Sequence, residues 1–69
     1  MPVISVKMAG KLPPKAELDA VASEITEVFV RRLGKAKERV VINFSEVDED
    51  AFYFGAQSVG DIKKGKSSC

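Results

Sequence analysis

The first eight residues alternate between two kinds of side chain. Pro2, Ile4, Val6 and Met8 fall on one face of an extended chain, and Val3, Ser5 and Lys7 fall on the other. A period of two residues is typical of a β-strand. The pattern therefore predicts a strand over residues 2–8.

A longer period begins after the loop Ala9–Pro14. A proline in the first helical turn is well suited to helix entry, so we expect a helix to start at Pro13 or Pro14. It should continue for about five turns at 3.6 residues per turn and end at Gly34, the expected left-handed stop. Apolar residues recur at three- and four-residue spacing along it, which predicts one amphipathic face: Leu18, Val21, Ala22, Ile25, Val28, Phe29 and Leu33.

A second alternating segment, Arg39–Ser45, predicts another strand, with Val40, Ile42 and Phe44 packing under the helix. A strand, a helix and a strand in this order form a β-α-β unit, whose strands run parallel. An acidic turn over residues 46–50 leads to an aromatic strand or hairpin over residues 51–55. The predicted fold class is α/β (α+β), with a β-α-β domain over residues 1–59, a short C-terminal hairpin, and a mobile tail over residues 60–69.

The size of the chain favours self-association. A chain of 69 residues buries only about 60% of the surface that its unfolded form exposes. It has one cysteine, Cys69, and no histidine. The chain therefore cannot form an intrachain disulfide, a Cys/His zinc site or a catalytic triad with histidine. We therefore expect the chain to form an oligomer.

The charge pattern indicates no special partner. The net charge is +1 and charges of both signs are mixed along the chain, so we expect neither nucleic acid nor a membrane as a partner. The apolar runs are shorter than a membrane span, and the start does not resemble a secretory signal. The cytoplasm is the default location.

Pro2 is the most informative single residue. If Met1 is removed, Pro2 carries a free secondary amine at the start of a strand, and an α-amine titrates at roughly 7.7–8.0. Such a group can act as a general base near neutral pH. The alternative is that Pro2 is an ordinary strand residue.

Other polar residues have weaker claims. Asn43 stands in mid-strand, where asparagine is disfavoured, and is either a site residue or an edge residue bonded to backbone. Lys11 is either a site cation or a surface lysine. The acidic cluster over residues 48–50 lacks calcium-loop spacing and is expected to be a solvated turn. The lysines of the tail are expected to aid solubility, and Cys69 is expected to be incidental.

The sequence resembles the tautomerase superfamily, whose small members are typified by 4-oxalocrotonate tautomerase. The residues that carry this resemblance are Met1-Pro2-Val3-Ile4, the long amphipathic helix, the strand Arg39-Val40-Val41-Ile42-Asn43-Phe44 and the aromatic hairpin. That strand is also similar to its counterpart in macrophage migration inhibitory factor. The similarity covers about residues 2–59. It implies a keto–enol tautomerase without a cofactor, in which Pro2 is the general base and the subunits form a homohexamer.

The resemblance also implies a binding site for a small carbonyl or enol acid. The strand position of a substrate-binding arginine is occupied here by Val41, with Arg39 two residues earlier on the same face. Lys11 lies near a first-loop arginine of the family, Phe52 matches the hairpin phenylalanine of the pocket wall, and Asn43 matches an active-site asparagine of the branch typified by macrophage migration inhibitory factor. Lys11 or Arg39 would then bind a carboxylate. One cation in an apolar pocket suits a monoacid such as phenylenolpyruvate better than a dicarboxylate.

Two other functions stay open. The first is a hydratase, dehalogenase or decarboxylase of the same superfamily, which needs a protonated Pro2 and a group that activates water. Glu46 is the nearest candidate for that group by residue type. The second is an oligomeric binding module with the same fold and no catalytic activity, which a retained Met1 would favour.

Overall fold

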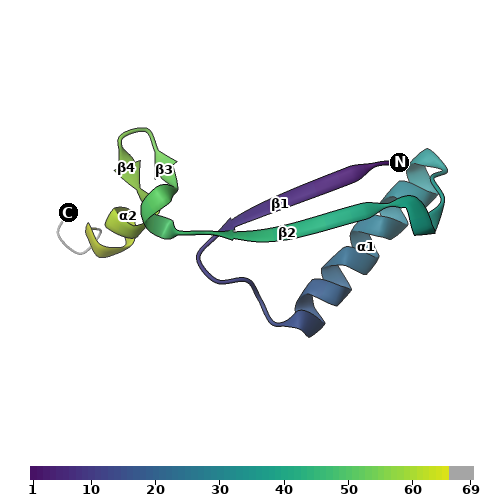
Figure 1. Cartoon of the computed structure of the whole chain (residues 1–69), viewed down its shortest axis with the longest axis horizontal. Coiled ribbons are helices and arrows are strands. Elements are labelled where there is room, and N and C mark those ends of the chain that lie inside the picture. Colours follow the sequence, from purple (N-terminus) through teal and green to yellow (C-terminus); the bar gives the residue numbers. More distant parts are fainter. Residues whose placement is uncertain (66–69) are drawn as a thin grey trace. The chain divides into compact units, whose positions relative to one another are not determined.

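The chain forms the predicted β-α-β unit, followed by a hairpin (Figure 1). The structure is a computed structural model and describes residues 1–65. Strand β1 (Val3–Ala9) pairs with β2 (Val41–Val47), and the two run parallel. Strands β3 (Tyr53–Phe54) and β4 (Gln57–Ser58) form an antiparallel hairpin. Both parts of the fold prediction are confirmed.

The chain divides into two compact units. The first contains Met1–Val6 and Pro13–Phe44, and the second contains Lys7–Leu12 and the chain from Ser45 onward. Each unit is described by itself below.

Helix α1 (Lys15–Leu33) dominates the first unit and has the ends that the sequence predicts. Pro14 occupies the N-cap position, and its carbonyl accepts hydrogen bonds from the Glu17 and Leu18 amides at 2.9 and 3.1 Å. Gly34 ends the helix at φ 65°, a left-handed conformation that costs glycine little. Its amide donates to the Val30 carbonyl at 3.0 Å. Backbone chemistry at the two ends therefore sets the length of the helix.

The alternation of β1 is confirmed by its exposure. Pro2, Ile4, Val6 and Met8 are half-buried, whereas Val3, Ser5 and Lys7 are exposed. The predicted inner face of the second strand, Val40, Ile42 and Phe44, is half-buried as well. Within the first unit, α1 lies along this strand pair (Figure 1).

The apolar face of α1 is wider than the part that the chain covers. Leu18, Ile25 and Phe29 are half-buried, but Val28 and Leu33 are 45% and 59% exposed. Among residues 1–65 no apolar side chain is fully buried. The single chain therefore has no closed hydrophobic core in the part that the structure describes.

Two boundaries differ from the sequence prediction. The second strand begins at Val41 and not at Arg39, because Lys37–Arg39 form a 3-10 turn (η1) in which the Arg39 amide donates to the Ala36 carbonyl at 2.9 Å. Helix α2 (Val59–Gly65) occupies the start of the expected tail. Residues 66–69, which include Lys66 and Cys69, lie outside the described residues.

The second unit is organised around the acidic turn, a short 3-10 helix η2 (Glu49–Ala51). The Asp48 carboxylate accepts a hydrogen bond from the Asp50 amide at 2.8 Å and so caps this turn. Glu49 forms an ion pair with Lys63 of α2 at 2.5 Å. Buried Ser58 accepts a hydrogen bond from the Asp61 amide at 3.1 Å and so caps α2. The predicted solvated turn is thus also the element against which α2 packs.

No helix in the described part of the chain is long and apolar enough to cross a membrane.

Candidate active site

Pro2 is held at the start of β1 by the neighbouring strand. Its carbonyl accepts a hydrogen bond from the Val41 amide at 3.0 Å. Pro2 itself is half-buried, whereas Met1 is 79% exposed. The proline ring nitrogen has no amide proton to contribute to the strand ladder, so Pro2 takes part in the ladder through its carbonyl.

Arg39 and Asn43 lie on either side of Val41 along the chain. Arg39 is exposed and belongs to η1, so the expected placement of Arg39 and Val41 on one strand face is wrong. The reason is the closed 3-10 turn, which replaces extended backbone at this position. Asn43 lies within β2 and is exposed, as is Val41 at 39%. Pro2, Arg39 and Asn43 therefore all belong to the first unit, around the start of β2.

Lys11 and Phe52 belong to the second unit. Lys11 is exposed and lies in the loop after β1, beside a surface depression that the end of β2 and the acidic turn also line. Phe52 is half-buried, and its ring meets that of Phe54 edge to face, with centroids 6.5 Å apart. The Val59 amide donates to the Phe52 carbonyl at 2.7 Å and so fixes the backbone of Phe52 beside the hairpin.

The aromatic hairpin leaves two of its rings outside. Tyr53 is 58% exposed and Phe54 is 67% exposed. Three successive aromatic side chains cannot all point into one small core, and these two remain exposed. They provide an apolar surface at the end of the second unit.

Glu46 has a role that the sequence did not show. Its Oε2 atom accepts a hydrogen bond from the Leu12 amide at 2.9 Å. The two residues are 34 positions apart, so no local pattern indicates the contact. The carboxylate that was the nearest candidate to activate water is therefore engaged with the Lys11 loop.

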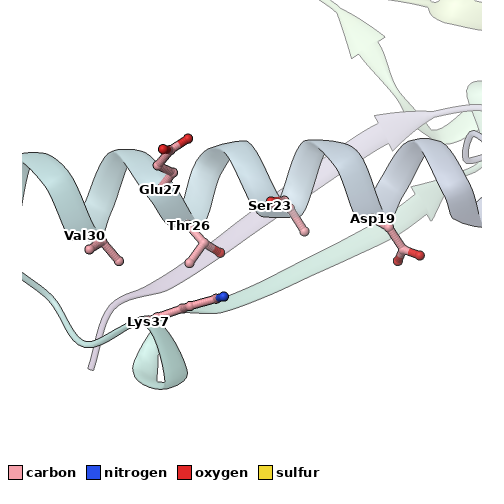
Figure 2. Close-up of a pocket in the computed structure, with 7 residues that line it drawn as sticks. Asp19, Ser23, Thr26, Glu27, Val30 and Lys37 are labelled. Atoms are coloured by element: carbon pink, nitrogen blue, oxygen red, sulfur yellow. The ribbon is translucent and has the colours of Figure 1, made fainter.

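A shallow groove on α1 is separate from all the predicted site residues (Figure 2). The Lys37 side chain extends from η1 beneath the helix, next to Ser23 and Thr26, while Glu27 points away from it (Figure 2). Asp19 and Val30 lie at the two ends of this groove. The groove is open and of mixed charge, and nothing in it indicates a reaction.

Two carboxylates of the acidic turn are bonded to other groups of the protein. No three His, Cys, Asp or Glu side chains within residues 1–65 gather as metal ligands. Asp48 and Glu49 are instead used by the Asp50 amide and by Lys63.

Comparison with known proteins identifies the family. The model of the family described as "Tautomerase enzyme" matches residues 2–62. The chain belongs to the tautomerase family. A probable tautomerase from Campylobacter jejuni is 33% identical to it over 63 residues, which cover 91% of this chain and 93% of that protein.

Two solved structures share the fold of this family member. DmpI from Helicobacter pylori superposes with a TM-score of 0.81 at 23% identity, over 91% of this chain and 97% of that one. A chain from the 4-oxalocrotonate tautomerase isozymes of Methylibium petroleiphilum gives a TM-score of 0.79 at 25% identity, over 93% and 98% of the two chains. The resemblance found from the residues alone is confirmed, and the protein is an enzyme of the tautomerase superfamily.

Proposed function

We propose that the protein is a keto–enol tautomerase that acts on a 2-oxo acid or a related enol without a cofactor. Removal of Met1 exposes the Pro2 amine, and this amine is the general base. It takes the proton from the enol oxygen and returns it to the neighbouring carbon, so that no proton is gained or lost overall. α-Amines titrate at roughly 7.7–8.0 in model peptides, and a group of this kind is suited to both transfers near neutral pH.

The anchoring of Pro2 is the observation that supports this role most directly. The Val41 amide holds the Pro2 carbonyl at 3.0 Å, and the proline ring restricts the backbone on the other side of the residue. The nitrogen is therefore positioned without being used in the strand ladder. The family match, which begins at residue 2, includes this residue.

The substrate carboxylate is assigned to Lys11 or Arg39. Both side chains are cations, and both residues are exposed to solvent. Asn43 is proposed to contact the substrate through its amide, and Phe52 is proposed to contact it through its aromatic ring. A site with one cation and an aromatic wall favours a monoacid, so phenylenolpyruvate is the probe substrate.

We also assign the active form to an oligomer, most simply a homohexamer. The support is the exposure of apolar side chains that a small soluble chain normally covers. Leu33 is 59% exposed and Phe54 is 67% exposed, and no apolar side chain of residues 1–65 is fully buried. Association would remove this surface from water.

The test is the replacement Pro2→Ala, assayed with phenylenolpyruvate at neutral pH. The primary amine has a different basicity and lacks the ring that directs it, so turnover should fall by about 10²–10⁴-fold, the usual contribution of acid–base catalysis. Circular dichroism and sedimentation should not change. A variant that retains Met1 is the control, because its Pro2 nitrogen is an amide and has no available lone pair.

Three results would change the assignment. If both variants act at the parent rate, Pro2 is not the base. An intact mass that includes Met1 in the native protein would favour a binding module without catalytic activity. An NMR titration that shows Pro2 protonated well above neutral pH would favour the hydratase-type reactions, in which Pro2 serves as an acid.

A further inference from the structure

The loop after β1 holds Lys11 between two anchors on β2. On one side, the Gly10 amide donates to the Val47 carbonyl at 2.9 Å. On the other side, the Leu12 amide donates to Oε2 of Glu46 at 2.9 Å. Because both neighbours of Lys11 are fixed to consecutive residues of the same strand, the direction in which the lysine leaves the backbone is set by β2.

Of these two hydrogen bonds, the one to Glu46 uses a side chain, whereas the one to Val47 joins backbone groups. A hydrogen bond from a backbone amide to a carboxylate is charge-assisted and stronger than a neutral one. It joins exposed groups, where water competes, so its net contribution to folding is small. Its effect on the local direction of the loop does not depend on that contribution.

The surroundings make this direction important. The depression beside Lys11 is lined by carboxylates of the acidic turn. Asp48 is bonded to the Asp50 amide and Glu49 is paired with Lys63, whereas Lys11 has no ion-pair partner among residues 1–65. An anionic substrate is attracted by the ammonium and repelled by the carboxylates, so it binds only if Lys11 points toward it and away from them.

We propose that Glu46 is a positioning residue for Lys11. By accepting the Leu12 amide, it orients the lysine toward the carboxylate of the enol acid. This inference rests on the proposed function, because it requires Lys11 to be the cation that binds the substrate. It also gives Glu46 a role other than the activation of water.

The experiment compares Glu46→Ala with Glu46→Gln, using phenylenolpyruvate and protein with a free Pro2. The Gln side chain keeps an oxygen that can accept the Leu12 amide, whereas Ala has none. Glu46→Ala should raise KM by about tenfold, the factor typical of losing one hydrogen bond between the Lys11 ammonium and the substrate carboxylate, and should leave kcat unchanged. Glu46→Gln should restore a KM close to that of the parent. Glu24→Ala, which removes an exposed glutamate of α1, is the matched control and should change neither constant.

A second measurement does not depend on a substrate. Hydrogen exchange of the Leu12 amide should become faster in Glu46→Ala and remain slow in Glu46→Gln. An equal exchange rate in the parent and in Glu46→Ala would overturn the proposed contact.

Further variants separate this inference from the proposed function. In a Lys11→Ala background, Glu46→Ala should not raise KM again. If Lys11→Ala raises KM and Glu46→Ala does not, the positioning role is wrong and the tautomerase assignment stands. If kcat falls in both Glu46→Ala and Glu46→Gln, Glu46 takes part in the chemistry and the positioning role is wrong. If Lys11→Ala leaves KM unchanged, the inference is overturned and Arg39 becomes the cation. Full turnover by Pro2→Ala would overturn the proposed function itself.

Discussion

Replacing Gly10 with alanine should destabilise the chain, for two reasons that can be measured separately. Gly10 has a φ of 90°, a region that residues with a side chain rarely adopt. A Cβ atom at this position would also lie 2.8 Å from Oε2 of Glu49, which is too close for unbonded atoms. The backbone is strained by the first effect, and Glu49 must move because of the second.

The magnitude follows from these terms. Positive φ costs an L-residue roughly 1–2 kcal/mol. Moving Glu49 weakens its ion pair with Lys63. The Glu49 side chain is 29% exposed and that of Lys63 is 64% exposed, and an ion pair at the surface contributes about 0–1 kcal/mol. Alanine also restricts the unfolded chain, which offsets the loss by roughly 0.4–1 kcal/mol. The free energy of unfolding should therefore fall by about 1–2 kcal/mol.

Gly34→Ala provides the matched control. Gly34 also has a positive φ, 65°, but nothing lies within 4 Å of the position that its Cβ would take. Both variants carry a positive-φ cost and the same unfolded-state term, but Gly10 lies further from the αL region than Gly34 and adds the contact with Glu49. Gly10→Ala should therefore be the less stable of the two, and the contact with Glu49 contributes to the difference.

Urea unfolding followed by circular dichroism gives these free energies. All variants should be compared at one protein concentration, because association makes apparent stability concentration-dependent. The reasoning is refuted if Gly10→Ala is as stable as the parent. It is refuted in its steric part if Gly10→Ala and Gly34→Ala lose the same amount.

Three further predictions follow from the site and the surface. Lys11→Ala or Arg39→Ala should raise KM for phenylenolpyruvate more than it lowers kcat, because the cation binds the ground state and the transition state alike; steady-state kinetics that show no change for either variant would mean that the carboxylate site is elsewhere. Ser58→Ala should lower the free energy of unfolding by about 1 kcal/mol, because it removes the hydroxyl that accepts the Asp61 amide; Ser58→Thr, which keeps a hydroxyl, is the comparison, and equal stability of the parent and Ser58→Ala in urea would contradict the capping role. The purified protein should sediment as a multimer, since the exposed apolar side chains need a partner; a stable monomer at micromolar concentration would contradict this.

The main elements could be predicted from the sequence because their signals are local. The alternation of Ile4 and Val6 against Val3 and Ser5 depends only on strand geometry, and the exposure of these residues confirms it. The ends of α1 depend on backbone restrictions at Pro14 and on the left-handed conformation of Gly34. Neither signal requires knowledge of distant contacts.

The parts that the sequence did not predict depend on contacts between distant residues or on backbone bonds. The apparent alternation around Val40 and Val41 extended the second strand to Arg39, but a backbone bond to Ala36 closes a 3-10 turn there. Helix α2 contains two glycines and has little helical propensity of its own. The Ser58 cap and the Glu49–Lys63 pair stabilise it, and both become visible only in the folded chain.

The residues of the candidate site also differ in how far the sequence could predict their roles. Pro2 could be singled out because its chemistry follows from its residue type and its place in the chain. Glu46 could be suggested only by residue type, and its bond to the Leu12 amide could not be predicted, because the two residues are 34 positions apart. The roles of Lys11, Arg39, Asn43 and Phe52 stay predictions, and the Lys11→Ala and Arg39→Ala variants test the first two.

Because the Val41 amide bonds to the Pro2 carbonyl, formation of the strand pair does not depend on the removal of Met1. This bond uses no atom that changes when Met1 is cleaved, so the strand is built equally well before and after processing. A chain with any N-terminal extension should therefore fold and associate normally, while its proline nitrogen stays an inert amide. If Pro2 is the general base, as proposed, a purification tag at this end would give folded protein without turnover, and a tag for activity assays should be placed at the other end.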